Sequence, residues 1–204
     1  MGETIQAVHF PTPELGWFVT DRALYKIVDG SVERFANAPM DYGFSTNVFG
    51  STTSAIVTQG EQLLLAAPGI LGLSPIPNSD GSMYMSVAGR SLEDVWFGRS
   101  DGTLRHYDGF SFVDIESGLT EGILQLVAAG ADLFFATEKQ IGRLNAAGDV
   151  ELLSDWSSHG GVSVTNLAFN GSTLFVSVND TRFIPYECGA TFVLWFDGVN
   201  FRRF

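Results

Sequence analysis

The stretch MSVAGRSLEDVWFGRSDGTLRHYDGFSFVDI, residues 85–115, decides the fold. It holds four short runs rich in apolar residues, MYMSVA (which starts at Met83), DVWFG, TLRHY and FSFVDI, separated by Gly, Ser and Asp. Two of the breaks are Asp-Gly pairs, and Asp-Gly between strand-like runs is a strong hairpin signal because it tolerates positive φ. The stretch therefore predicts a meander of four antiparallel strands.

The same pattern recurs five times along the chain. The repeats align at Val8, Val57, Val87, Val127 and Ala168, which lie 49, 30, 40 and 41 residues apart. A period near 40 residues made of four short strands is typical of β-propeller blades, whereas helical repeats of that length would show a 3.6-residue period that is absent here. We therefore expect an all-β chain with a single domain, residues 1–204, of five four-stranded antiparallel blades at about 5–35, 54–81, 83–115, 123–153 and 164–204.

Each expected second strand carries three apolar residues in a row. Successive strand residues point to opposite faces, so an apolar triplet indicates a strand that is buried on both faces. Stacked blades bury both faces of a sheet, whereas an open sheet with one wet face does not. The triplets are Trp17-Phe18-Val19, Leu63-Leu64-Leu65, Val95-Trp96-Phe97, Leu133-Phe134-Phe135 and Leu174-Phe175-Val176.

Two repeats depart from the pattern. In blade 2, Pro75 and Pro77 stand where the fourth strand is due, so we expect this blade to be shortened. Blade 5 carries an insertion at residues 181–190. Because the first repeat starts with a first strand and the last ends with a fourth strand, we expect blade 5 to pack on blade 1 in a closed five-bladed ring. The alternative is that the chain forms part of a larger propeller.

The chain is strongly acidic. Acidic residues outnumber basic ones by 23 to 11, which gives a formal net charge of −12. Such a surface repels phosphate backbones and anionic headgroups, so nucleic acids and membrane surfaces are poor partners. No window is apolar for long enough to insert into a membrane. Cations, neutral sugars or basic protein patches suit this charge better; the alternative is that it serves solubility alone.

Cys188 is the only cysteine, which excludes an internal disulfide and a cysteine-rich zinc site. The first residues, MGETIQAVHF, lack a basic head followed by a long apolar run, so we expect no signal peptide in them. These features fit either a reducing compartment or the mature part of an exported protein.

Residues 95–148, VWFGRSDGTLRHYDGFSFVDIESGLTEGILQLVAAGADLFFATEKQIGRLNAAG, resemble the repeats of the propeller sensor modules of bacterial two-component regulators. Those repeats combine an aromatic pair, a Gly-hydrophobic-Arg-Tyr-Asp phrase and a Gly-Leu connection. The matching positions are 95–98, 105–109, 118–119 and 142–145. The phrase VAGRSLEDVWFG with HYDG also resembles tandem repeats of exported myxobacterial proteins. The resemblance implies a propeller with sensing, adhesion or lyase roles and favours an extracytoplasmic or secreted location.

Four acidic residues follow the apolar triplets, in the expected loops between second and third strands: Asp21, Asp101, Glu138 and Asp180. In a propeller these loops open around the central channel, on the usual ligand face. A ring of carboxylates there suits a divalent cation such as calcium, or the acid and base of a glycosidase. The alternative is ordinary turn chemistry, because Asp before Gly is common in tight turns. No other cofactor is expected.

The connections between blades hold the remaining candidate ligand-binding residues, Tyr42 in the segment 36–53 and Trp156 and His159 in the segment 154–162. An indole beside Asp155, two serine hydroxyls and an imidazole suits a sugar, since aromatic faces stack on sugar rings and polar neighbours fix their orientation. The alternative for Trp156 is a core position at the end of a fourth strand.

The sequence contains no recognised catalytic or phosphate-binding motif, and its three histidines fall in three different repeats. We therefore expect a non-enzymatic module that binds a glycan, a small ligand or a protein on its loop-rich face. In blade number and size alone the chain is similar to the five-bladed sugar-binding propeller of the horseshoe-crab lectin type. Two alternatives stay open: a glycosidase or lyase that uses the acid ring, and an architectural module of a surface or virion assembly.

Overall fold

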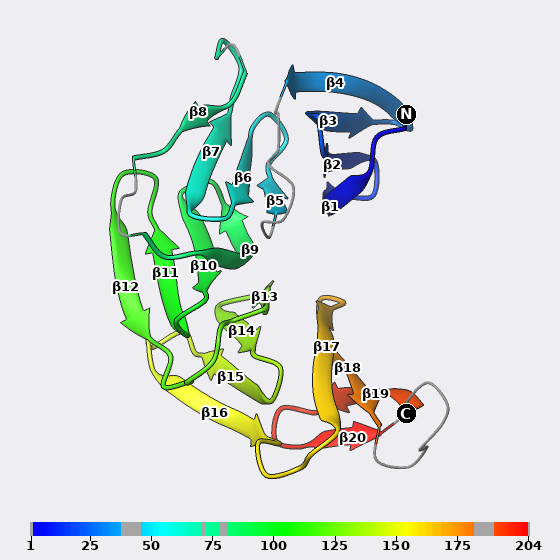
Figure 1. Ribbon diagram of the computed structural model, residues 1–204, viewed down its shortest axis with the longest axis vertical. Helices are drawn as coiled ribbons and strands as arrows, with labels where there is room; N and C mark the ends of the chain where they lie inside the picture. Colours follow the sequence, from blue (N-terminus) through cyan, green and yellow to red (C-terminus); the bar gives the residue numbers. More distant parts are fainter. Residues whose placement is uncertain (1, 38–45, 71, 78–80, 182–189, 204) are drawn as a thin grey trace.

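The computed structural model describes residues 2–37, 46–70, 72–77, 81–181 and 190–203. All the regular structure in these residues is β-strand (Figure 1). The strands are β1 (Ile5–Thr12), β2 (Leu15–Thr20), β3 (Ala23–Val28), β4 (Ser31–Asn37), β5 (Thr46–Gly50), β6 (Ala55–Gln59), β7 (Gln62–Ala66), β8 (Ser74–Pro75), β9 (Tyr84–Ser91), β10 (Asp94–Arg99), β11 (Thr103–Tyr107), β12 (Phe112–Glu116), β13 (Gln125–Ala129), β14 (Asp132–Ala136), β15 (Gln140–Leu144), β16 (Val150–Asp155), β17 (Val162–Phe169), β18 (Leu174–Asp180), β19 (Ala190–Phe196) and β20 (Phe201–Arg203). Within the described ranges no helix is long and apolar enough to cross a membrane.

The strands form five four-stranded antiparallel sheets, each built from four consecutive strands. We call them blades 1 to 5, namely β1–β4, β5–β8, β9–β12, β13–β16 and β17–β20, and letter the strands of each blade a to d in chain order. The five a strands follow one another along an arc in Figure 1, and neighbouring a strands pack together from β1 on β5 to β13 on β17. The predicted all-β architecture of four-stranded blades is confirmed.

Blade 3 shows why the apolar triplets specify stacked sheets. Val95 and Phe97 are fully buried in a cluster with side chains of blade 2. Trp96, between them in sequence, points to the other face and packs in a cluster with side chains of blade 4. The alternation of strand side chains thus gives each face of the sheet its own apolar core.

Blade 2 starts earlier than predicted. Its a strand is β5, in a segment expected to be a loop, and Leu63–Leu65 therefore lies in strand c, not in strand b. The cause is a local likeness: GEQLLLA at 60–66 follows the same pattern as GADLFFA at 130–136, which is a turn into strand b of blade 4. Both segments place an apolar triplet after a tight turn, so the sequence alone does not tell strand b from strand c.

The corrected start makes the repeat regular. Residues that pair in register with strand b at the same position of each blade are Val8, Val48, Val87, Leu126 and Leu167, which lie 40, 39, 39 and 41 residues apart. Strand d of blade 2 is reduced to β8, as expected for the shortened blade. Pro75 lies in this outer edge strand, where its missing N–H leaves no ladder partner unsatisfied.

The expected packing of blade 5 on blade 1 is not observed. Extensive strand contacts join each blade to the next, but none of comparable extent joins a described strand of blade 5 to blade 1. The arc in Figure 1 accordingly leaves an opening between β1 and β17. The curvature of the arc, which the repeat number does not reveal, keeps the two terminal blades apart.

Candidate functional site

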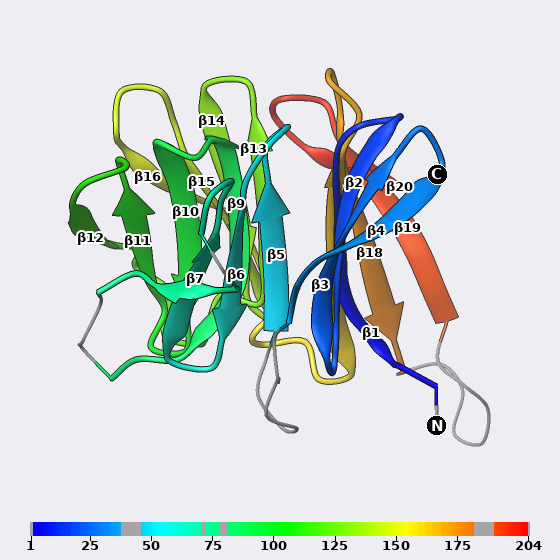
Figure 2. The same ribbon diagram turned by 90° about the horizontal axis from the view of Figure 1, so that it is seen from above.

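The strands run between two loop-bearing faces, as Figure 2 shows. The b–c turns and the connections between blades lie on one of them, which we call the b–c face. The a–b and c–d turns lie on the opposite face, which we call the a–b face. This follows from the antiparallel order of the strands, because successive turns of a meander alternate between its two ends.

A cavity of about 450 Å³ opens where the connection from blade 4 to blade 5 reaches the b–c face. We call it the Trp156 cavity. Asp155, Trp156 and His159 line it from this connection. Its apolar wall consists of Val162, Val178, Phe192 and Leu194, all from blade 5. The structure therefore brings the predicted ligand-binding residues Trp156 and His159 to a single cavity.

The polar side of the Trp156 cavity is held in place by short-range hydrogen bonds. Asp155 Oδ1 accepts the backbone N–H of Ser157 at 2.7 Å, and Asp155 Oδ2 accepts Gln140 Nε2 at 3.1 Å. Hydrogen bonds from the side chain and the backbone of Ser157 and from the Gln140 side chain lower the pKa of Asp155, so it is a carboxylate at neutral pH. The backbone N–H of His159 donates to Trp156 O at 2.8 Å, which folds the connection back on itself. The edge of the cavity thus carries the Asp155 carboxylate and the His159 imidazole.

Trp156 serves the core as well as the cavity. It directly follows β16, is half-buried, and packs against the apolar cluster shared by blades 4 and 5. Its ring centroid lies 6.4 Å from that of Phe201, and its backbone N–H donates to Lys139 O at 2.9 Å. One part of this indole therefore rests on the core while another lines the cavity, and its stacking on a sugar stays a prediction.

Two of the four predicted acids are buried. Asp21 Oδ1 accepts the backbone N–H of Thr4 at 2.9 Å, and the Asp21 N–H donates to Thr4 O at 3.1 Å, so this residue ties the start of β1 to the b–c turn. Asp180 is also buried and ends β18, where it pairs in register with Val162 and Ala190. The bond from a backbone N–H to the buried carboxylate of Asp21 is typical of a structural role.

The other two acids are solvent-accessible. Asp101 Oδ1 accepts the N–H of Thr103 at 2.9 Å, and Asp101 Oδ2 lies 3.0 Å from Arg99 Nη2. Glu138 Oε1 lies 3.6 Å from Lys139 Nζ. No group of three or more His, Cys, Asp or Glu side chains is placed to hold a metal ion in the part of the chain that the structure describes. In these residues the acids therefore do not form the carboxylate ring that one interpretation of the sequence allowed.

Blade 2 adds an acidic residue that the alignment of the five internal repeats did not reveal. Strand β6 ends at Gln59 and β7 begins at Gln62, so the b–c turn is Gly60-Glu61, and Glu61 is exposed. The signal that reveals it is the regular 40-residue spacing, which appears once β5 is recognised. The last predicted residue, Tyr42, lies outside the described residues, so its role stays a prediction.

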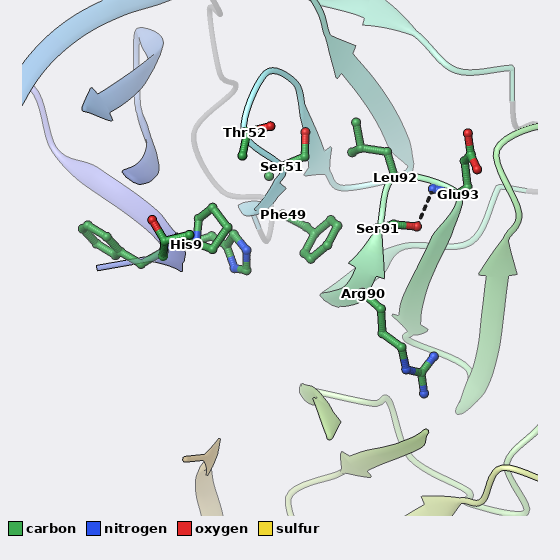
Figure 3. Close-up of a pocket in the computed structure, with 13 residues that line it drawn as sticks. His9, Phe49, Ser51, Thr52, Arg90, Ser91, Leu92 and Glu93 are labelled. Atoms are coloured by element: carbon green, nitrogen blue, oxygen red, sulfur yellow. Dashed lines mark hydrogen bonds between the residues drawn. The ribbon is translucent and has the colours of Figure 1, made fainter. Parts of the chain in front are cut away.

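A larger cavity, of about 710 Å³, lies on the a–b face and was not expected from the sequence. It opens at the ends of β1, β5 and β9, and we call it the His9 cavity. Figure 3 shows His9 and Phe49 pointing toward one another, and their ring centroids lie 4.9 Å apart. Hydroxyl-bearing Ser51, Thr52 and Ser91 complete part of the lining.

The His9 imidazole and the Arg90 guanidinium at this cavity have structural contacts. Burial lowers the pKa of His9, which favours its neutral form. Arg90 extends away from the His9 and Phe49 rings, toward blade 4 (Figure 3), where its Nη2 donates to Ala131 O at 2.7 Å. Its Nη1 binds Asp94 Oδ2 at 2.7 Å. Arg90 thus joins blade 3 to blade 4.

No protein-family model matches the chain, and no curated protein matches it. Solved structures do. The Pan2 WD40 domain of Neurospora crassa is 10% identical with a TM-score of 0.68 over 98% of this chain and 65% of that domain. The extracellular domain of the one component system BT4673 from B. thetaiotaomicron is 12% identical, with a TM-score of 0.65 over 98% of this chain and 27% of that one. YCF48 bound to D1 peptide is 13% identical, with a TM-score of 0.65 over 98% and 67%.

The chain spans less than two thirds of the Pan2 domain and about a quarter of the BT4673 domain. At these identities the likeness bears on the fold alone. It agrees with the five stacked four-stranded sheets, the apolar cores between them and the arc of inner strands. The chain therefore has the β-propeller fold.

Proposed function

We propose that this propeller is a non-enzymatic binding module whose b–c face takes a neutral glycan in the Trp156 cavity. The observation that carries the proposal is the convergence of Asp155, Trp156 and His159 on a cavity with an apolar wall. An aromatic wall offers a stacking surface for the C–H face of a sugar ring. The carboxylate and imidazole at the edge offer an acceptor and a donor for sugar hydroxyls.

The charge of the chain supports a neutral ligand. With a formal net charge of −12, the surface repels anionic sugars and phosphates over the range of a Debye length. The Asp155 carboxylate adds a local negative charge at the cavity edge, because its lowered pKa keeps it ionised. A neutral hexose, bound through hydroxyls, avoids this penalty.

A peptide is the second candidate ligand. It is favoured by the likeness to YCF48, a propeller solved with the D1 peptide bound. A basic peptide would complement the formal net charge of −12 that this chain carries. A glycosidase or lyase using the acids, and an architectural role, stay predictions.

The test is a thermal-shift screen of neutral mono- and oligosaccharides, acidic sugars, basic peptides and calcium, followed by calorimetric titration of the hits. We expect a neutral sugar to bind, and Trp156→Ala to weaken it at least tenfold, which equals about 1.4 kcal/mol. Trp156→Phe should retain part of the affinity because a smaller ring still stacks. Asp155→Asn tests the carboxylate separately.

The matched controls are Asp21→Asn and Asp101→Asn, which change predicted acids outside the Trp156 cavity. Unchanged affinity in these variants together with loss in Trp156→Ala supports the site. If Asp21→Asn or Asp101→Asn lost affinity for the sugar while Trp156→Ala kept it, the binding site would lie at these acids. A screen in which only a basic peptide binds would replace the glycan by the peptide.

A further inference from the structure

The His9 cavity, on the face opposite the Trp156 cavity, has the size and the lining of a site for a small molecule. Its volume of about 710 Å³ lies within the range of about 300–1,000 Å³ that is usual for small-molecule pockets. The ends of β1, β5 and β9 line it, so three neighbouring blades build it together. The Trp156 cavity is lined from the connection to blade 5 and from blade 5 itself, so the two cavities share no residue.

The two rings that meet in the His9 cavity are particular to blades 1 and 2. His9 and Phe49 stand at the same register position of their a strands, and their ring centroids lie 4.9 Å apart. The residues at this position in blades 3, 4 and 5 are aliphatic, namely Ala88, Val127 and Ala168. Packing of one blade on the next therefore does not require a ring at this position, and the ring pair in Figure 3 is a local feature of the cavity.

The surroundings of the ring pair hold it in place. A Cβ at Gly89 would lie 2.9 Å from Phe49 Cζ, and a Cβ at Gly50 would overlap the indole of Trp17, so both glycines allow a close approach. Trp17 is fully buried, pairs in register with His9 and donates from Nε1 to Ser51 O at 2.7 Å. The walls of the cavity are therefore ordered before any ligand arrives, which lowers the entropy cost of binding.

His9 keeps one imidazole nitrogen available as an acceptor. Burial lowers its pKa, so the ring is neutral at pH 7. A hydrogen bond to the Gly50 backbone acts in the opposite direction and raises the pKa; because such a bond favours the protonated form, the imidazole donates and the Gly50 carbonyl accepts. The second nitrogen of a neutral imidazole carries no proton and accepts a hydrogen bond. The cavity thus offers an acceptor beside an aromatic surface.

The charged groups around the cavity favour a cationic ligand. The Arg90 guanidinium is turned toward blade 4, where it binds Ala131 O, and Lys26 Nζ donates to Thr52 O at 2.6 Å. Glu93 is exposed and lines the cavity from the blade 3 side (Figure 3). Both cations are therefore engaged by backbone oxygens, and the formal net charge of −12 attracts a positively charged ligand.

We propose that the His9 cavity is a second ligand site, for an arylalkylamine whose ring carries a hydrogen-bond donor. The aryl ring lies against the His9 and Phe49 rings, where aromatic pairs are stabilised beyond their buried area. The ring donor binds the free nitrogen of His9. The ammonium group is directed toward the Glu93 carboxylate, and Phe10 and Leu92 provide apolar surface beside the ring. This site goes beyond the proposed glycan site, and either can exist without the other.

The first experiment titrates the unaltered chain with tyramine and three analogues by calorimetry at physiological ionic strength. 2-Phenylethylamine lacks the ring donor, 3-(4-hydroxyphenyl)propionate replaces the ammonium by a carboxylate, and 4-(2-aminoethyl)cyclohexanol lacks the aromatic ring. We expect tyramine to bind, and each analogue to bind about fivefold more weakly or worse, because each loses one of the three interactions. These comparisons do not depend on the folding of any variant.

The second experiment assigns the interactions to residues. His9→Leu keeps an apolar side chain but removes the acceptor, so tyramine and 2-phenylethylamine should then bind alike. Glu93→Gln should weaken tyramine about threefold, the range of a solvent-exposed ion pair. Glu121→Gln, at an exposed position in the connection between blades 3 and 4, is the matched control and should change nothing.

The indole N–H signals in nitrogen-resolved NMR tell the two cavities apart. Tyramine should shift the signal of Trp17, whose Nε1 is bonded to Ser51 in the lining of the His9 cavity, and leave the Trp156 signal fixed. A neutral sugar should do the reverse, so failure of one site is distinguishable from failure of the other.

Four outcomes would overturn the inference. The first is the absence of tyramine binding up to millimolar concentration. The second is a carboxylate analogue that binds as tightly as tyramine, since the site would then not select a cation. The third is a His9→Leu variant that still prefers tyramine to 2-phenylethylamine. The fourth is a loss of affinity in Glu121→Gln equal to that in Glu93→Gln, because the amine would then bind the acidic surface in general.

Discussion

His106 Nε2 lies 2.9 Å from Asp94 Oδ1, and the His106 ring stacks on Trp96 with centroids 4.2 Å apart. Trp96 Nε1 donates to the same carboxylate oxygen at 2.9 Å. Arg90 binds the other oxygen and reaches the backbone of blade 4. The strand histidine thus has a packing role, in a polar cluster that connects two blades.

Asp94 should make stability fall in acid. Burial alone would raise its pKa, but the hydrogen bonds from Arg90 and His106 outweigh burial and lower the pKa. As pH falls, Asp94 is therefore protonated in the unfolded chain before it is protonated in the folded chain. The stabilisation that the Asp94 carboxylate gives is lost as pH falls below about 4 and through its folded-state pKa. Asp94→Asn should reduce stability at pH 7 and flatten the dependence in this range, as measured by urea unfolding. If the unfolding free energy of Asp94→Asn fell with pH as steeply as that of the original chain, Asp94 would not be the cause.

His9 should also make folding stability depend on pH, in a higher pH range than Asp94. Burial lowers its pKa in the folded chain, so below about pH 6.5 the unfolded chain binds more protons and stability falls as pH drops. His9→Gln should weaken this loss of stability between about pH 6.5 and 5. The exposed residue His159 gives the matched control, His159→Gln. If the control changes the profile as much as His9→Gln, burial of His9 is not the cause.

Gly98 should not tolerate a side chain. A Cβ at this position would lie 2.6 Å from the backbone oxygen of Ile123, which cannot rotate away, and 2.4 Å from Ser86 Oγ. We expect Gly98→Ala to cost about 1–3 kcal/mol of unfolding free energy through overpacking. Gly160→Ala, where a Cβ would meet nothing within 4 Å, should be near neutral in the same denaturant experiment. Equal stability of the two variants would show that strand β10 shifts to relieve the contact.

The sequence predicts the five sheets because period, turn residues and apolar triplets all report local structure. It misplaces the start of blade 2 because GEQLLLA and GADLFFA are alike, although one leads into strand c and the other into strand b. It leaves open whether five blades close a ring or form part of a larger propeller, since local signals contain no information on the curvature with which blades stack.

The candidate site was predictable only where its residues are neighbours in sequence. Asp155, Trp156 and His159 stand within five positions, and the structure adds Phe192 and Leu194 from a different strand. The His9 cavity combines residues from three blades, and no sequence pattern marks it. The acids were predicted on the b–c turns, yet burial of Asp21 and Asp180 depends on neighbouring segments that the turns alone do not reveal.

The most direct test of glycan binding follows the indole N–H signals of the four tryptophans by nitrogen-resolved NMR during titration with the best neutral sugar from the screen. Trp17 and Trp96 are buried with their Nε1–H bonded to Ser51 O and to Asp94, so they serve as internal references. The account predicts a selective, saturable shift of the Trp156 signal. A Trp156 signal that stays fixed while the sugar binds would contradict it.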